Sequence, residues 1–265
     1  AAKGKIVLLE GTHKTGDLGI VSDDLNITGE GRAIIDAQNS NRILYVGEDA
    51  KVVISNVIMV NGYTIDESGA LLGNSNELTL INCTLANSSA SQNNGGAIFS
   101  IGKLTIINTT IANCTAVRGG AIYTQTEKDG TQINIFNSTF ENNIAKGKET
   151  WGGGAIYAQR TGAIYEFALT VDNSTFKGNK AQGTSCGGAI QIEQLNSDVK
   201  ITGSEFIANH ANGKDDYGGG AIYVSSPSSY DRQGTMAISD SLFENNTCDS
   251  NGGAILAKTT TVTVA

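Results

Sequence analysis

The chain has 265 residues, a formal net charge of −8, 33 glycines, one proline, 6% aromatic residues and 17% charged residues. This acidic balance argues against nucleic acid as a partner, because phosphate backbones attract basic surfaces. Abundant glycine with one proline is typical of a tightly turned sheet protein, and a surface of Asn, Ser, Thr and Gly suits an extracellular protein. The sequence shows neither a transmembrane run nor a signal peptide.

Short alternating stretches recur along the whole chain. Their first and third residues are apolar, and this alternation predicts strands with one buried face. Each stretch ends in Asn, Gly or Asp, which tolerate a left-handed backbone, and stacked Asn amides at this bend are expected to hydrogen-bond to one another. The stretches are Leu25–Gly29, Val52–Asn56, Leu78–Asn82, Leu104–Asn108, Ile133–Asn137, Leu169–Asn173, Val199–Gly203 and Met236–Asp240, and Val262–Val264 begins a ninth.

Two inward positions follow each bend. One residue after it stands a mostly small residue: Val57, Cys83, Thr109, Ser138, Ser174, Ser204 and Ser241. Three residues after it stands a large apolar one: Met59, Leu85, Ile111, Phe140, Phe176, Phe206 and Phe243. Because both positions share one parity, we expect the large side chains to form a single stack in the core.

The tetrapeptide Gly-Gly-Ala-Ile occurs six times, beginning at Gly95, Gly119, Gly153, Gly187, Gly219 and Gly252, and Ser68–Leu71 is a degenerate seventh copy. Successive alanines are 24 to 34 residues apart, a period that indicates a repeat architecture. If each Ile points inward, the Ala before it and the residue after it point outward. The residues after Ile are Phe99, Tyr123, Tyr157, Gln191, Tyr223 and Leu256, which predicts an outer aromatic stripe.

Three short strands with turns between them make one coil of a parallel β-helix. We therefore predict an all-β, single-stranded, right-handed parallel β-helix of about nine coils, forming one domain over residues 1–265. The handedness rests on chain chirality and on precedent among such folds. The pattern begins in mid-repeat and ends in mid-strand, so we expect a piece of a longer surface protein whose membrane anchor lies outside this chain.

Gly-Gly-Ala-Ile alternates with Phe-x-x-Asn, at Phe140–Asn143, Phe176–Asn179, Phe206–Asn209 and Phe243–Asn246. This pair of motifs resembles the repeat of the chlamydial polymorphic membrane proteins. It is equally similar to the adhesin-like surface proteins of methanogenic archaea, whose opening coils Ile27–Gly31 resembles. The resemblance implies a right-handed parallel β-helix displayed on a cell surface and acting in adhesion. In two earlier coils Leu85 and Ile111 replace the Phe, and Ser88 and Cys114 replace the Asn.

The aromatic stripe and the variable loops are the candidate binding surface. Aromatic faces stack on sugars, and loops that recur at one point of a coil project from one side of the rod. The predicted contact residues are Phe99, Tyr123, Tyr157, Tyr223, Trp151 and Tyr217, with Arg160, Tyr165 and Tyr230 as further loop anchors. The predicted function is a cell-surface, extracellular adhesin-like module that attaches to host or neighbouring cells through glycans or surface proteins.

Two other functions remain open. One is a carbohydrate-active enzyme, a polysaccharide lyase or glycosidase, and the other is a structural rod or filament subunit that associates end to end. Glycoside hydrolysis needs carboxylates on adjacent coils, whereas the acidic pairs Asp23-Asp24 and Asp215-Asp216 lie at opposite ends of the chain. Two adjacent carboxylates also supply too few calcium ligands. We therefore expect no catalytic residue, no metal site and no cofactor.

Modification sites complete the sequence-based predictions. Asn-x-Ser/Thr sequons occur at the bend asparagines and at four other positions, which we expect to be the better glycan acceptors: Asn26, Asn87, Asn113 and Asn245. The cysteines show no Cys-x-x-Cys pair and occupy different places in their coils, so free thiols are expected at Cys83, Cys114, Cys186 and Cys248.

Overall fold

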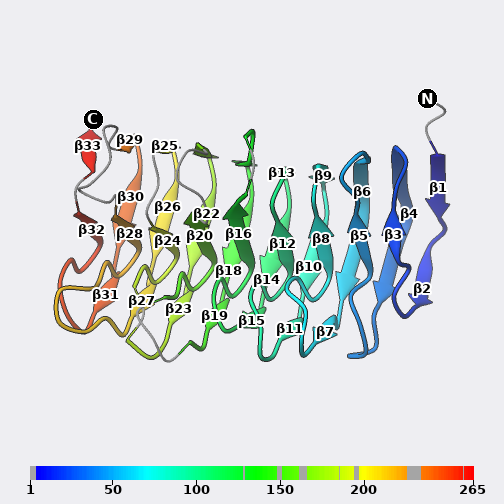
Figure 1. Ribbon diagram of the computed structural model, residues 1–265, viewed down its shortest axis with the longest axis horizontal. Helices are drawn as coiled ribbons and strands as arrows, with labels where there is room; N and C mark the ends of the chain where they lie inside the picture. Colours follow the sequence, from blue (N-terminus) through cyan, green and yellow to red (C-terminus); the bar gives the residue numbers. More distant parts are fainter. Residues whose placement is uncertain are drawn as a thin grey trace.

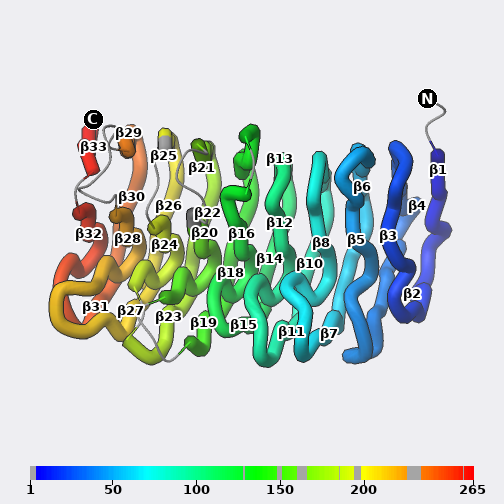
Figure 2. Tube along the Cα trace, in the orientation of Figure 1, coloured from blue at the N-terminus to red at the C-terminus, as the bar shows by residue number. Residues whose placement is uncertain are grey.

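A computed structural model describes residues 4–127, 129–147, 151–160, 166–184, 186–193, 197–225, 234–258 and 260–265, without the side chains of Arg160 and Ser197. In these parts of the chain, parallel strands stack side by side along a rod, with the two termini at opposite ends (Figure 1). The trace winds through one coil after another from blue to red (Figure 2). The predicted all-β parallel β-helix is confirmed.

The described strands form three sheets, here called sheets 1, 2 and 3. Sheet 1 contains β1 (Gly4–Leu8), β2 (Gly11–Lys14), β4 (Leu25–Asp36), β6 (Lys51–Val60), β9 (Glu77–Ile81), β10 (Thr84–Ala86), β13 (Lys103–Ile107), β14 (Thr110–Ala112), β17 (Gln132–Phe136), β18 (Thr139–Glu141), β21 (Phe167–Asp172), β22 (Thr175–Lys177), β25 (Ser197–Thr202), β26 (Glu205–Ile207), β29 (Thr235–Ser239), β30 (Leu242–Glu244) and β33 (Thr261–Val264).

Sheet 3 contributes to every described coil, and sheet 2 begins with the third of them. Sheet 2 contains β7 (Tyr63–Thr64), β11 (Ser89–Ala90), β15 (Thr115–Ala116), β19 (Ile144–Ala145), β23 (Lys180–Ala181), β27 (His210–Ala211) and β31 (Thr247–Cys248). Sheet 3 contains β3 (Ile20–Val21), β5 (Leu44–Val46), β8 (Leu72–Asn74), β12 (Ile98–Ser100), β16 (Ile122–Thr126), β20 (Ile156–Arg160), β24 (Ile190–Glu193), β28 (Ile222–Ser225) and β32 (Ile255–Lys258).

Equivalent residues of successive coils stack in columns, so each core side chain packs on its own counterparts. In sheet 1, Leu104 pairs with Leu78 on one side and with Ile133 on the other, and all three are buried. The predicted stack of large residues is also confirmed. Its phenyl rings lie nearly parallel, with centroids 4.7 Å apart for Phe140 and Phe176 and 4.9 Å apart for Phe176 and Phe206.

The bend residues adopt the left-handed conformation that their side chains predict. The bend asparagines Asn56, Asn82, Asn108, Asn137 and Asn173 have φ angles between 47° and 58°. The bend predicted at Gly29 is wrong. The register between β4 and β6 shifts between Thr28 and Ala33, and the residue that adopts the left-handed conformation there is Gly31, with a φ of 58°. The predicted amide bonds between bend asparagines occur in two exposed pairs: Asn82 donates to Asn56, and Asn173 donates to Asn137.

A continuous ladder of side-chain amides lies instead at the turn from sheet 1 to sheet 2, where the Phe-x-x-Asn motif places its Asn. Asn179 accepts bonds at Oδ1 from the backbone N–H and the side-chain amide of Asn143, at 3.1 and 3.0 Å. Its own Nδ2 donates to the carbonyl of Phe140 at 2.9 Å and to Asn209 Oδ1 at 3.0 Å. The ladder continues to Asn246, and Asn143, Asn179 and Asn209 each tie three coils together.

The small residues after the bend form a second ladder. The backbone N–H of Ser138 donates to the hydroxyl of Ser174 at 3.0 Å, and that of Ser174 donates to Ser204 at 3.1 Å. Each hydroxyl in turn donates to a carbonyl two residues earlier, as Ser174 does to Asp172. These buried hydroxyls therefore satisfy backbone groups at the bend that would otherwise lack a partner.

The paired glycines of the tetrapeptide let consecutive coils touch. Gly119 has a φ of 60°, and a Cβ on Gly120 would lie 2.2 Å from the carbonyl oxygen of Gly154 in the next coil. The register corrects the degenerate copy, because Leu72 pairs with Ile98 and Gly69 has the left-handed φ of 76°. The seventh copy is thus Gly69–Leu72, one residue later than Ser68–Leu71.

The tetrapeptide alanines face the core, contrary to the outward orientation expected from alternation. The N–H groups of both Ala97 and Ile98 donate to one carbonyl, that of Ala121, at 2.9 Å. Two consecutive residues bonded to one acceptor do not alternate, so Ala97 and Ile98 both join the buried apolar cluster. All four cysteines are free thiols, as predicted: Cys83, Cys114 and Cys186 are buried and Cys248 is half-buried.

Candidate functional site

The predicted aromatic stripe lies on sheet 3, one ring per coil, but it is covered. Tyr123 pairs with Phe99 and with Tyr157, while Gln191 separates Tyr157 from Tyr223. Tyr123 is 3% exposed, Tyr157 0% and Tyr223 2%, whereas Phe99 is half-buried. The expectation that these three tyrosines are exposed is therefore wrong, because segments that precede the Gly-Gly pairs pack over their rings.

The rings of Phe99, Tyr123 and Tyr157 form one stack along the rod. The centroids of Phe99 and Tyr123 are 5.8 Å apart at an interplanar angle of 22°, and those of Tyr123 and Tyr157 are 5.7 Å apart at 6°. The strand register fixes this spacing. The row is therefore a rigid platform on which the covering side chains rest.

The cover consists of half-buried side chains, here called the cover residues: Arg118, Trp151, Tyr217 and Lys258. Trp151 meets Tyr157 edge to face, with centroids 6.5 Å apart at 76°, and the Arg118 guanidinium lies 5.1 Å from the Trp151 ring. Tyr217 packs 6.1 Å from Tyr223, and the Lys258 ammonium lies 4.7 Å from the Tyr217 ring. The two predicted loop anchors, Trp151 and Tyr217, thus each cover one part of the tyrosine row.

A row of polar side chains runs beside the tyrosines. It stands three residues after five of the six tetrapeptide isoleucines, those from Ile122 onward, and consists of Gln125, Gln159, Glu193, Ser225 and Lys258. Tyr123 donates its hydroxyl to Gln159, and Tyr157 donates its hydroxyl to Glu193, both at 3.2 Å. The sequence reasoning missed this row, although its constant offset from Ile could have revealed it.

Burial controls the electrostatics of this face. It raises the pKa of the Tyr123 hydroxyl to about 12 and also raises the pKa values of the Tyr157 and Tyr223 hydroxyls. Burial likewise raises the pKa of the Glu193 carboxyl above its ordinary 4.5, opposed by hydrogen bonds from Gln191 and Tyr157 and by the charge of Arg118. Beneath the cover, the tyrosines therefore stay neutral, and water is largely excluded.

Together these side chains offer aromatic edges, a guanidinium and amides at a partly accessible surface. Phe99, Arg118, Trp151, Gln125 and Gln159 are half-buried around the two fully covered tyrosines. Aromatic and arginine side chains on a rigid support are the usual anchors of contact surfaces, and amides hydrogen-bond to sugar hydroxyls. Side chains of these kinds are suited to stacking and hydrogen-bonding contacts.

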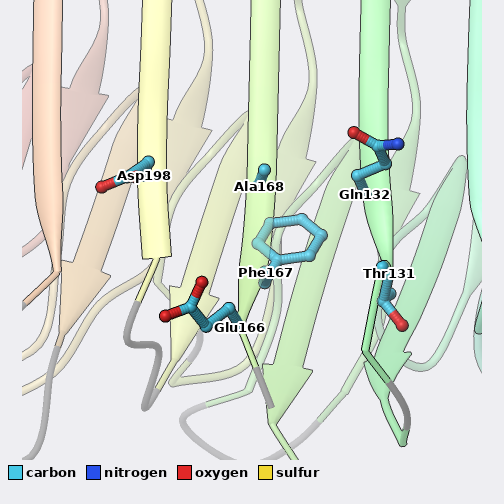
Figure 3. Close-up of a pocket in the computed structure, with 7 residues that line it drawn as sticks. Thr131, Gln132, Glu166, Phe167, Ala168 and Asp198 are labelled. Atoms are coloured by element: carbon cyan, nitrogen blue, oxygen red, sulfur yellow. The ribbon is translucent and has the colours of Figure 1, made fainter.

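A separate groove crosses three coils at the beginning of the sheet 1 strands (Figure 3). It has a volume of about 210 Å³, and the small side chain of Ala168 stands between those of Gln132 and Asp198. Glu166 and Asp198 are exposed at its rim, and Asp198 accepts a bond from the hydroxyl of Thr235 at 2.8 Å. Sequence reasoning did not bring these two carboxylates together.

The remaining predicted sites are dispersed. Asp215 has a φ of 57° in a turn, and within the described ranges no group of three His, Cys, Asp or Glu could hold a metal ion. Asn87, Asn113 and Asn245 are exposed, and Asn26 is half-buried in β4, so glycosylation there stays a prediction. Tyr165, Tyr230 and the Arg160 side chain lie outside the described residues. In the part of the chain that the structure describes, no helix is suited to crossing a membrane.

The fold and its motifs define a parallel β-helical solenoid built from a short sequence repeat. Three segments, residues 137–159, 173–193 and 240–258, match the family model of the Chlamydia polymorphic membrane protein repeat. Each segment contains one bend and one Gly-Gly-Ala-Ile copy. Comparisons with curated proteins and with solved structures give no match. The chlamydial part of the resemblance is thus supported, and the archaeal part stays a prediction.

Proposed function

We propose that the chain is a binding module of a cell-surface adhesin, and that the cover residues packed over sheet 3 attach it to glycans or proteins of another cell. The repeat match and the parallel β-helix fit a surface adhesin-like protein. The observation that carries the proposal is the packing of half-buried Trp151 and Tyr217 on the buried tyrosine row. Anchors held on a rigid support lose little conformational entropy when they bind.

Replacing Trp151 and Tyr217 together by Ala is expected to remove binding and to leave the fold intact. Both side chains are half-buried, so the free energy of unfolding should fall by about 1 kcal/mol per substitution. Loss of a contact anchor costs about 2 kcal/mol or more in binding, which is roughly 30-fold. The measurement compares the adhesion of protein-coated beads to an epithelial cell monolayer with the melting curve of each variant.

Tyr63→Ala is the matched control for that experiment, since Tyr63 is a half-buried tyrosine on sheet 2. It should lose about half as much stability as the double variant and adhere like the wild type. Adhesion of the double variant at the wild-type level would show that the contact lies elsewhere on the rod. Adhesion lost equally in Tyr63→Ala would contradict the assignment to sheet 3.

A carbohydrate-active enzyme on the same scaffold is the second candidate. The groove favours it, because Glu166 and Asp198 bring two exposed carboxylates from neighbouring coils to one rim. Incubation with polygalacturonate and with pectin distinguishes the two functions. Release of sugar by the wild type that is abolished in Glu166→Gln would establish the enzyme, and no release is expected from a binding module.

A filament subunit is the third candidate. Large apolar side chains are exposed on the first and last described coils, among them Ile20 and Val264, each 70% exposed. Such edges can pair with a second copy of the chain, which would associate end to end. The molar mass in solution, measured over a range of concentrations, separates this function from that of a monomeric binding module.

A further inference from the structure

The outer column of sheet 3 that carries the tyrosine row has a gap at Gly73. Over the first four described coils this column consists of Ile20, Tyr45, Gly73 and Phe99, each paired with the next. A Cβ on Gly73 would lie 2.1 Å from Cδ2 of Tyr45, and its three nearest atoms all belong to that ring. The Tyr45 ring therefore lies over the strand of the next coil, in the space that a side chain at position 73 would need.

Two neighbours hold the Tyr45 ring in this place. Its hydroxyl shares a hydrogen bond of 2.5 Å with the hydroxyl of Ser75, which is 4% exposed. The Arg42 guanidinium lies 5.2 Å from the ring centroid, and it donates to the carbonyls of Gly69 and Ser68 at 2.9 and 2.8 Å. Tyr45 is nevertheless half-buried, so part of a positioned ring stays accessible and little conformational entropy is lost when a ligand packs on it.

A hollow of about 350 Å³ lies beside Tyr45. Tyr45 and Ile20 supply apolar surface to it, and Ile20 is 70% exposed. Glu48 and Asp49, in the turn after β5, line it with exposed carboxylates, and the side chains of both lack a hydrogen bond or ion pair to any residue that the structure describes. Apolar surface with a few polar groups around it is the usual composition of a small-ligand site.

We propose that this hollow binds one neutral sugar residue of a glycan. The C–H groups of a pyranose ring pack on Tyr45 and Ile20, and its hydroxyls donate to Glu48 and Asp49, whose ionised carboxylates only accept hydrogen bonds. An acidic sugar is disfavoured, because its own carboxylate would meet these two, and the described lining contains no lysine, arginine or histidine to offset the repulsion.

This sugar site is separate from the cover residues. It lies in the first coils of sheet 3, whereas Trp151 and Tyr217 pack on Tyr157 and Tyr223 in later coils. Sugar binding at Tyr45 therefore goes beyond the proposed function and does not require that function to be correct. The double variant with Trp151 and Tyr217 replaced by Ala should bind the sugar as the wild type does.

Ligand-observed NMR titration with single sugars tests the site. The neutral probes are the methyl glycosides of glucose, galactose, mannose and N-acetylglucosamine, and the charged probes are glucuronic acid and glucosamine. At least one neutral sugar should bind with a Kd on the order of 1 mM, the affinity expected for a ligand of this size. Glucuronic acid and glucosamine should both bind about tenfold more weakly than that sugar.

Two kinds of variant assign the binding to this hollow. Gly73→Ala adds a methyl group that meets the Tyr45 ring, and it should weaken binding about tenfold by displacing that ring. The double variant Glu48→Ala, Asp49→Ala removes exposed side chains, so it should fold normally and also bind about tenfold more weakly. Glu244→Ala, which removes an exposed carboxyl on β30, is its matched control and should bind like the wild type.

Three outcomes would overturn the sugar site. The first is a neutral panel of which no member binds, and the second is tighter binding of glucuronic acid or glucosamine than of every neutral sugar. The third is unchanged binding in the Glu48→Ala, Asp49→Ala double variant. Bead adhesion does not enter these measurements, so a failure of the sugar site and a failure of the proposed function are distinguishable.

Discussion

Phe176→Ala is expected to lower the free energy of unfolding by about 3–5 kcal/mol. The ring is fully buried between Phe140 and Phe206, whose centroids are 4.7 and 4.9 Å away. These neighbours are fixed by the strand register and cannot collapse into the gap, so the variant should keep most of the cavity. Urea denaturation followed by circular dichroism measures the effect.

The matched control for Phe176 is Leu242→Ala. Leu242 is an apolar residue of β30 that is 47% exposed, so its removal should change stability by about 0.5 kcal/mol or less. A cost below about 1 kcal/mol for Phe176→Ala, equal to that of the control, would mean that the phenyl stack is not the core.

Asn179→Ala is expected to cost about 3–5 kcal/mol, although it deletes a small polar side chain. It removes the acceptor of the Asn143 backbone N–H and the donor to the Phe140 carbonyl, and it leaves both groups buried. Each buried polar group without a partner costs about 1–3 kcal/mol. The same urea titration measures this loss.

Asn173→Gly provides the comparison for the amide ladder. Asn173 is an exposed bend residue with a φ of 47°, which glycine adopts readily, so this variant should lie within about 0.5 kcal/mol of the wild type. Equal costs for the two asparagine variants would show that the buried ladder contributes no more than a surface amide.

The sequence predicts those features that repeat locally. The alternation of Leu104-Thr105-Ile106 with a left-handed Asn108 fixes the inward face of its strand, and the structure agrees. Phe176 was placed in the core by the same parity. These predictions hold because strand periodicity and bend conformation depend on neighbours within a few residues.

The features that the sequence did not predict depend on other coils. The bond between Asn143 and Asn179 joins residues 36 apart, and the inward turn of Ala97 depends on a carbonyl in the next coil. The burial of Tyr157 depends on Trp151, which stands in a loop of variable length. Local alternation carries no information about such contacts. It therefore predicts correctly that Tyr157 lies on the outer side of sheet 3, but the predicted exposure of its ring is wrong.

Masking one face of the rod tests the central claim, that adhesion is carried by sheet 3. In a Cys248→Ser background, a polyethylene glycol chain is attached to Gln125→Cys on β16 or to Thr139→Cys on β18, two half-buried, outward positions on sheets 3 and 1. Bead adhesion to the epithelial monolayer is then measured. Loss of adhesion with the label on Gln125→Cys, and full adhesion with the label on Thr139→Cys, is the predicted result. Full adhesion with sheet 3 masked, or loss only with sheet 1 masked, would contradict it.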